Sequence, residues 1–307
     1  MYQMGIELVY ENSTNNKTLE GVYHKGQAKI WDGKEALSDL IKLHGGLHLE
    51  EDKINSIQNI FSTILWGEYA AWNVSAELAA NINDFGAKMA ATSQAHDEAR
   101  HYYVMQDYFK HLNIKPKKLP PNIYKVINAV SETNNLAKKL IGMQLMIEPI
   151  AITIFKLVIR SRVEPVLCDL LRLYEIDEAR HMALGIKYLP QMIKNMSRYE
   201  LADLLVWQLR MMLLEVDGLK ELEEDFINLG FDINEVYALA ESKQLEAIEL
   251  LSSQLNLRIK PWTVMKGLVR LKKKVIFDNV SYEKFGRFHK QYSYEGYRAT
   301  DNGLKNV

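Results

Sequence analysis

The pentapeptide Asp-Glu-Ala-Arg-His occurs twice in the chain, at 97–101 and again at 177–181. Each copy contains Glu-x-x-His, and residues three apart project from the same face of an α-helix. Carboxylate and imidazole are both metal ligands, and two such pairs are what a dinuclear metal site in a four-helix bundle requires. The candidate ligands from the two copies are Glu98, His101, Glu178 and His181.

A site of this kind also needs one Glu from each of two further helices. Glu68 and Glu148 are each a lone acid in an apolar segment, and each lies 30 residues before the Glu of one pentapeptide. The midpoint of each interval falls in a predicted turn. With a rise of about 1.5 Å per residue, both members of a pair then lie roughly 20 Å from the bend. Each helical hairpin therefore places one Glu beside one Glu-x-x-His.

Charge indicates what this cluster would hold. An unpaired buried carboxylate costs several kcal/mol or becomes protonated, and four of them close together would repel strongly. Two divalent cations supply four positive charges and remove that penalty. Four carboxylates and two imidazoles without a thiolate suit iron or manganese better than a structural zinc ion. We therefore expect two metal ions; Fe/Fe is the first expectation and Mn/Fe the alternative, and the donors themselves do not distinguish iron from manganese.

The residues that flank the ligands are predicted to support them: Asp97, Arg100, Asp177 and Arg180. A metal-bound His usually donates its other ring N–H to a carboxylate. We expect crossed pairs, Asp97 with His181 and Asp177 with His101, with the two Arg side chains positioning the acids. The alternative is that all four are surface charges at the edges of the motif.

The sequence gives fewer indications of where a substrate would bind. Residues near the ligands that could line a pocket are Trp72, Tyr102, Ile152, Thr153 and Tyr174, with Ala71 and Met182 as further candidates. At helical spacing such residues also occur as plain core. An apolar cavity would suit a fatty acyl group or another hydrophobic substrate.

Composition and pattern favour an all-α protein, because Gly and Pro are sparse and good helix formers are frequent. The predicted helices cover about 51–80, 87–111, 132–160, 165–192, 197–230, a sixth from 232, and 261–277. Glu164 stands at a break and is expected to cap the following helix. The fold class is thus a four-helix bundle of two helical hairpins, with extra helices at the C-terminal side.

The expected organisation has four parts. They are an N-terminal arm at 1–50 with a short helix near 33–44, the bundle core at 51–195, additional helices at 196–277, and an aromatic-rich tail at 278–307. The apolar run at 140–159 is long enough to cross a bilayer. It contains Glu148, however, and a carboxylate is costly in lipid, so a buried bundle helix is expected rather than a membrane span.

The charge balance of 38 basic and 39 acidic residues argues against nucleic-acid binding, which requires a basic excess. The single cysteine, Cys168, cannot form an internal disulfide and is read as a small buried hydrophobe. The polar N-terminus lacks the apolar core of a signal peptide. A cytoplasmic location is therefore expected.

The double Asp-Glu-x-Arg-His with two upstream Glu residues resembles the ferritin-like di-iron carboxylate superfamily. Within its oxygen-activating branch, 61–68, the first Glu-x-x-His and 177–185 look most like ligand-binding oxidases built on the ribonucleotide reductase small-subunit scaffold. The resemblance covers about 55–190. It implies that the six candidates match the family's ligands. It also implies that two reduced metal ions activate O2 to hydroxylate, desaturate or otherwise oxidise a small organic substrate. An external electron donor, such as a ferredoxin or reductase, and a homodimer are typical.

Two positions depart from relatives within that superfamily. Reductase small subunits commonly carry a radical tyrosine four residues after the first His, and here that residue is Met105. Arylamine N-oxygenases carry a seventh ligand, a His, four residues before the last Glu, and here that residue is Tyr174. Alternatives that stay open are a radical-generating subunit, including a manganese–iron form without the tyrosine, a ferroxidase, and a helical scaffold without metal.

Overall fold

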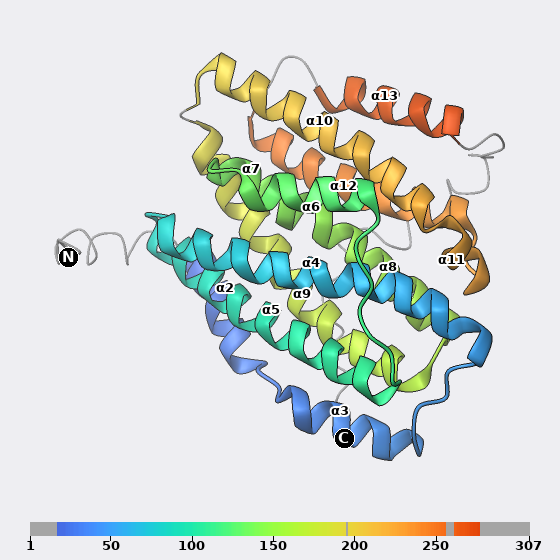
Figure 1. Cartoon of the computed structure of the whole chain (residues 1–307). Helices are drawn as coiled ribbons and strands as arrows, with labels where there is room; N and C mark the ends of the chain where they lie inside the picture. The colour runs from blue at the N-terminus through green and yellow to red at the C-terminus, as the bar shows by residue number, and fades with distance from the viewer. Residues whose placement is uncertain (1–16, 195, 256–260, 277–307) are drawn as a thin grey trace.

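The computed structural model describes residues 17–194, 196–255 and 261–276, which contain helices and no strand. Figure 1 shows the arrangement. The elements are α2 (Lys17–Ala28), α3 (Gly33–His44), the short 3-10 turn η1 (Glu51–Lys53), α4 (Ile54–Asn81), α5 (Phe85–His111), α6 (Pro121–Glu132), α7 (Leu136–Gly142), the π turn η2 (Met143–Ile147), α8 (Glu148–Ser161), α9 (Pro165–Lys194), α10 (Arg198–Glu221), α11 (Glu223–Asn228), α12 (Ile233–Leu255) and α13 (Pro261–Ile276). The predicted aromatic tail lies outside the described residues.

Two helical hairpins form the centre of the molecule. The first pairs α4 with α5, and the second pairs the run α7–η2–α8 with α9; α5 and α9 also pack against each other (Figure 1). The expected all-α bundle of two hairpins is confirmed for the described residues. Of the C-terminal helices, α10 and α12 pack on the second hairpin, and α10 also packs on α6. Helix α11 packs on α4, and α13 packs on α10 and α12, so the extra helices expected at the C-terminal side are present.

The two hairpin turns repeat one another. The ends of α4 and α8, and the starts of α5 and α9, are each 80 residues apart. Asp84 Oδ1 accepts a hydrogen bond from the Ala87 backbone N–H at 2.8 Å, and Glu164 Oε2 accepts one from the Leu167 N–H at 2.7 Å. Both carboxylates satisfy a backbone donor that the first turn of a helix leaves free. The prediction that Glu164 is a cap is confirmed.

The third bundle helix differs from the prediction. One continuous helix over 132–160 is wrong, because α6 ends at Glu132, Asn135 caps a new helix, and a π turn precedes Glu148. Pro149 supplies the physical reason: it has no N–H to bond the carbonyl four residues earlier, and its ring crowds that carbonyl. A wider turn before the proline accommodates the ring.

The N-terminal arm is more ordered than the sequence indicates. It contains α2 in addition to the predicted helix at 33–44, and α2 packs on α5 and α9. Leu19 is fully buried, and a Cβ added at Gly26 would lie 2.3 Å from Ser93 Oγ on α5. The missing side chain therefore permits the close approach of α2 to the bundle.

The C-terminal layer begins with a capping box. Ser197 Oγ accepts from the Glu200 N–H at 3.3 Å, and Glu200 Oε2 accepts from the Ser197 N–H at 2.7 Å, as the sequence predicts. From this cap, α10 runs along α6 and α13. The layer therefore closes the bundle on the side of α6 and α8.

One stretch, Leu136–Ser161, is long and apolar enough to cross a membrane. Most of its residues are buried inside the protein, where it packs against α9, α10 and α12. A core helix of a bundle passes the same test of length and composition, and burial on several sides is what such a helix requires.

Candidate metal centre

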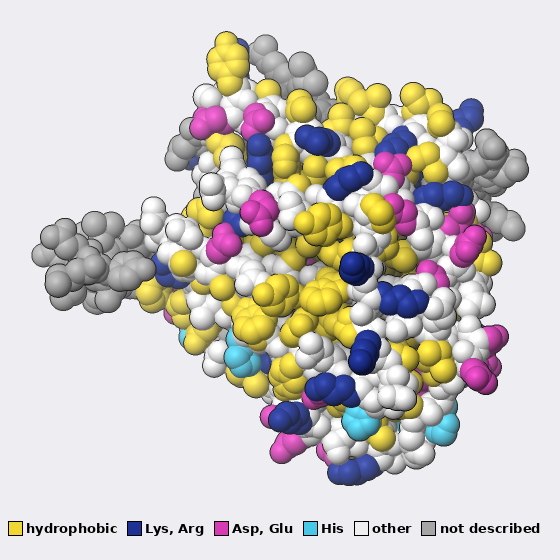
Figure 2. Space-filling view, in the orientation of Figure 1, with side chains coloured by type: hydrophobic (Ala, Val, Ile, Leu, Met, Phe, Trp, Pro, Cys, Tyr) yellow, Lys and Arg dark blue, Asp and Glu magenta, His cyan; other side chains and the backbone are white. Residues whose placement is uncertain are grey.

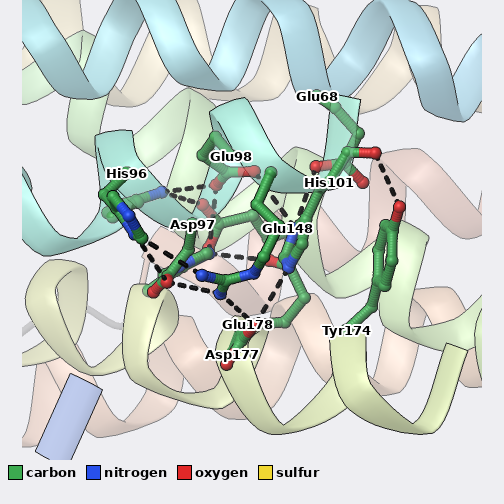
Figure 3. A network of polar contacts seen from close by, with 12 residues as sticks. Glu68, His96, Asp97, Glu98, His101, Glu148, Tyr174, Asp177 and Glu178 are labelled. Atoms are coloured by element: carbon green, nitrogen blue, oxygen red, sulfur yellow. Dashed lines mark hydrogen bonds and ion pairs between the residues drawn. The ribbon is translucent and has the colours of Figure 1, made fainter. Parts of the chain in front are cut away.

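The structure brings all six predicted ligands together in the middle of the two hairpins (Figure 3). Glu68 comes from α4, Glu148 from the start of α8, and the two Glu-His pairs from α5 and α9. All six side chains are at most 5% exposed. They form two groups whose ligand atoms lie within 4.8 Å of one another: Glu68, Glu98, His101 and Glu178; and Glu98, Glu148, Glu178 and His181.

Glu98 and Glu178 belong to both groups. They occupy the position of carboxylates shared by two ions, while Glu68 and Glu148 each serve one group. The sequence does not distinguish these roles, because all four acids look equivalent in the 30-residue spacing. The cluster can therefore hold two metal ions, each with three carboxylates and one imidazole.

The two imidazoles present the same ring nitrogen to the carboxylates. His101 Nδ1 lies 3.3 Å from Glu68 Oε2 and 3.4 Å from Glu178 Oε1. His181 Nδ1 lies 3.0 Å from Glu98 Oε1 and 3.2 Å from Glu178 Oε2. Nδ1 is therefore the nitrogen that faces the metal positions in each half.

The other ring nitrogens contact the aspartates in the crossed arrangement that the sequence analysis expects. His101 Nε2 lies 3.1 Å from Asp177 Oδ2, and His181 Nε2 lies 3.4 Å from Asp97 Oδ2. A carboxylate at this nitrogen fixes the tautomer with a proton on Nε2 and leaves the Nδ1 lone pair for a metal ion.

Two buried arginines link the aspartates into a ring of alternating charge. Arg100 Nη2 donates to Asp97 at 2.6 Å and to Asp177 at 2.8 Å. Arg180 Nη2 donates to the same two aspartates at 3.0 and 2.5 Å. All four residues are buried, so the alternative of surface charges at the edges of the motif is wrong.

The pKa shifts follow from burial and crowding. Burial raises the pKa of Glu68 and Glu148 well above the ordinary value, and nearby Glu carboxylates add to the shift. Burial opposes ionisation of Glu98 as well, but the two imidazoles outweigh it and hold its pKa well below the usual range. The surrounding carboxylates likewise overcome burial and raise the pKa of His101 and His181.

The aspartates are the firmly ionised members. Burial disfavours the charged form of Asp97, yet the hydrogen bond and charge of His181 lower its pKa to about 2. Asp177 has its pKa lowered further, against the effect of burial, by His101 and the two arginines. These acids therefore keep their charge to orient the imidazoles.

Two carboxylate oxygens provide a test of whether a metal ion fits. Glu98 Oε2 and Glu148 Oε2 are buried and have no hydrogen-bond partner among the described residues. Buried carboxylate oxygens are normally satisfied, and a bound ion is one recognised reason when no protein donor satisfies them. The donor chemistry and these two atoms therefore fit divalent cations.

Gln94 is a neighbour of the cluster that the sequence analysis missed. Its Nε2 donates to Glu98 at 3.1 Å and to Glu148 at 2.5 Å, and its Oε1 accepts from Gln144 Nε2 at 3.0 Å. It lies one helical turn before Glu98, so its position on the ligand face of α5 was a usable signal.

Trp31 was also missed, because it lies in the arm where no helical period persists. Its Nε1 donates to Asp177 Oδ2 at 2.9 Å, and the Arg100 guanidinium lies 4.5 Å from its ring centroid. Tyr174 stacks on the His101 imidazole with centroids 4.0 Å apart, and its hydroxyl donates to the His101 carbonyl at 2.6 Å. Aromatic rings thus cover the imidazole of the first half.

A cavity of about 90 Å³ adjoins the cluster. The four metal-facing Glu residues line one part of it. Apart from Thr63 and Glu215, its other lining residues are apolar or Gly and come from α4, α6, η2, α8, α10 and the residue that follows α10. Glu215 was not predicted, because nothing in the sequence indicates that α10 reaches the site.

Of the predicted pocket residues, Ala71 lines this cavity, whereas Trp72, Tyr102, Ile152, Thr153 and Tyr174 are not among its described lining residues. Residues four after a ligand point to one flank of its helix, whereas the cavity lies on the other flank, toward Gly67 and Ala71. Trp72 and Tyr102 instead pack with Tyr69, and Trp72 and Tyr69 are exposed. Figure 2 shows hydrophobic side chains gathered in the middle of the face that it draws.

The other three have different partners. Thr153 Oγ1 donates to the Pro149 carbonyl at 2.8 Å, Ile152 is buried in the packing of α8, and Tyr174 covers His101. For these residues the reading as plain core describes the structure.

Fold and site together define a helical bundle with a carboxylate-rich centre that can hold two metal ions. No protein-family model and no curated protein sequence matches the chain. A solved structure of a Synechococcus protein with aldehyde deformylating oxidase activity matches with a TM-score of 0.59 at 16% identity, over 72% of this chain and 98% of its own. A structure of an R2-like ligand-binding oxidase with a Mn/Fe cofactor aligns over 86% of this chain and 93% of its own, with a TM-score of 0.47 and 14% identity.

The likeness to the Synechococcus protein shows the fold, and the predicted ferritin-like bundle is confirmed.

Proposed function

We propose that the protein binds two metal ions, Fe/Fe or Mn/Fe, and uses O2 to oxidise a small, mainly apolar organic molecule. The observation that carries this proposal is the pair of overlapping ligand groups, which share two carboxylates and open on an apolar cavity. The proposed ligands are Glu68, Glu98, His101, Glu148, Glu178 and His181. The oxidase activities of the proteins with similar structures agree with this reading.

The residues of the chain prepare the site for such chemistry. Asp97 and Asp177 hold the imidazoles with Nδ1 toward the metal positions. Glu98 and Glu178, which belong to both ligand groups, would contribute to holding both ions, and the apolar cavity wall would exclude water from the substrate. Two reduced ions in this setting supply electrons for O2 reduction coupled to oxidation of a C–H bond.

The proposal includes an external electron donor, such as a ferredoxin or reductase, because oxidation of a C–H bond by O2 with release of water consumes two electrons beyond those taken from the substrate. A homodimer and a cytoplasmic location complete it. Hydroxylation and desaturation are both compatible with the cavity, so the proposal is made at the level of C–H oxidation.

Two observations favour a substrate-oxidising enzyme over the alternatives. Met105, where a radical tyrosine would lie, is fully buried and has no hydroxyl to oxidise. An apolar cavity beside the carboxylates serves an organic molecule, whereas a ferroxidase needs only a path for iron. Both points weigh against a tyrosyl-radical subunit and an iron-storage role.

The test is metal analysis combined with rapid mixing. The chain is loaded anaerobically with Fe(II), or with Mn(II) and Fe(II), and we expect two ions per chain and a transient absorbance change on mixing with O2. A Glu77→Gln variant is the matched control, because Glu77 lies on α4 but is half exposed and pairs with Lys139. Fewer than two ions per chain in the wild type would refute the proposal.

A further inference from the structure

Glu215 is the only acidic residue in the cavity lining that lies outside the two ligand groups. It stands on α10, in the C-terminal layer, and is 8% exposed. Its Oε2 accepts a hydrogen bond from Gln244 Nε2 at 2.7 Å. Its Oε1 is buried and has no hydrogen-bond partner among the described residues.

A purely structural role explains the position of only one of the two oxygens of this carboxyl group. The Gln244 contact ties α10 to α12 through one oxygen, and the same amide nitrogen also lies 3.4 Å from the Met146 carbonyl of the π turn. The second oxygen is left unsatisfied at the wall of a cavity. Buried polar atoms without a partner are rare and require an explanation, such as a ligand that supplies the missing partner.

The surroundings favour the neutral form of the group. The titratable residues that line the cavity with Glu215 are the four metal-facing Glu side chains, and its described lining contains no lysine or arginine. From α12 the group that contacts it is the Gln244 amide, while Glu241 of α12 pairs with Arg270 and Lys273 of α13. Burial raises the pKa of Glu215 to about 8, although the Gln244 hydrogen bond acts in the opposite direction.

We propose that Glu215 binds the hydroxyl or carbonyl oxygen of a neutral, otherwise apolar ligand, whose hydrocarbon part fills the cavity toward the metal cluster. Because Oε2 already accepts from Gln244, the proton resides on Oε1 and is donated to the ligand oxygen. A carboxylate ligand would meet a group that is itself acidic. An ammonium ligand would require an ion pair to be desolvated in an apolar cavity.

This inference rests on the proposed function in one respect: the bound molecule is taken to be the one that is oxidised. With the polar end at Glu215, oxidation would fall on the hydrocarbon part rather than on the polar group. The cavity of about 90 Å³ is smaller than the roughly 150 Å³ apolar cavity that holds benzene, so a chain of about four carbons fits without rearrangement.

The experiment uses 1-butanol, butylammonium and butyrate as probes of equal length in ligand-observed NMR titrations of the Mn(II)-loaded protein. We expect 1-butanol to bind most tightly. Since Mn(II) relaxes nearby protons, the methyl protons should relax faster than the C1 protons. Glu215→Leu should weaken 1-butanol binding about five- to tenfold, the range of one neutral hydrogen bond. Glu215→Gln, which keeps a donor, should stay within about threefold.

Gln208→Leu is the matched control, because Gln208 is buried on α10 two turns earlier and does not line the cavity. It should leave 1-butanol affinity unchanged. The proposal is overturned by no binding of 1-butanol to the wild type, by tighter binding of butylammonium, by an equal loss in Gln208→Leu, or by faster relaxation at C1. Titrations of the metal-free chain separate the two proposals: failure to bind Mn(II) refutes the proposed function, whereas 1-butanol binding still reports on Glu215.

Discussion

Replacing Glu98 by Gln removes a carboxylate that both ligand groups share. The structure therefore predicts that this change weakens the binding of both metal ions, whereas Glu68→Gln weakens only the binding of the ion beside His101. The sequence does not distinguish shared from unshared carboxylates, so this difference between Glu98 and Glu68 is a prediction of the structure alone. Glutamine keeps the shape of the side chain and changes its charge.

The size of the effect follows from the charge that is lost. A unit negative charge about 4 Å from a divalent cation contributes about 8 kcal/mol at an effective dielectric constant of about 20. Removal of its repulsion with one neighbouring carboxylate returns about 4 kcal/mol, which leaves a net loss of about 4 kcal/mol. This equals roughly a thousandfold in affinity, since about 1.4 kcal/mol corresponds to a factor of ten. In Glu98→Gln each ion loses that attraction; in Glu68→Gln the second ion keeps its three carboxylates.

The assay is a titration with Mn(II) followed by metal analysis after gel filtration. We expect two ions per chain in the wild type, one in Glu68→Gln and close to none in Glu98→Gln at micromolar metal. Circular dichroism checks that each variant stays helical. Retention of two ions by Glu98→Gln, or loss of both by Glu68→Gln, would refute the assignment of shared and unshared carboxylates.

Three further predictions follow from contacts around the site. Asp177→Asn and Asp97→Asn should each lower the affinity for one metal ion by about 10- to 100-fold, namely the ion bound by the imidazole that the aspartate contacts. An equal loss of affinity for both ions in a stepwise titration would contradict the crossed pairing. Folded Glu215 holds a proton that the unfolded chain releases above about pH 4.5, so the free energy of unfolding of the wild type should fall relative to that of Glu215→Gln as the pH rises to about 8. The fall should be at most about 5 kcal/mol. A difference between the two proteins that stays constant in urea unfolding at about pH 5, 6.5 and 8 would exclude this. Gly185→Ala should cost about 1–3 kcal/mol in urea unfolding, because its Cβ would lie 2.8 Å from a Cβ of the π turn, while Gly67→Ala, with no atom within 4 Å, should not destabilise the protein.

The sequence predicted the parts of the structure that depend on local spacing. Glu-x-x-His puts two ligands on one helix face, and the 30-residue interval returns a hairpin to the same height, so the six ligands could be brought together without any knowledge of packing. An acidic residue at a turn before a predicted helix can also be recognised as a helix cap from the sequence, as Glu164 was. The π turn was missed because Pro149 can be accommodated in several ways, and only packing decides which one.

The cavity could not be predicted, for a different physical reason. The repeat shifted by 80 residues relates the two hairpins, and it relates Glu68 to Glu148 on the cavity wall. Residues of α4, η2 and α8 supply another part of the wall, but α6 and α10, which have no counterpart in the repeat, complete it, and α10 contributes Glu215. The repeat therefore determines the positions of the six metal ligands. The cavity for an organic molecule depends instead on which helices outside the repeat pack against one side of the two hairpins. The polar group that faces the ligand accordingly lies about 35 residues beyond the last metal ligand in the sequence, where no ligand spacing points to it.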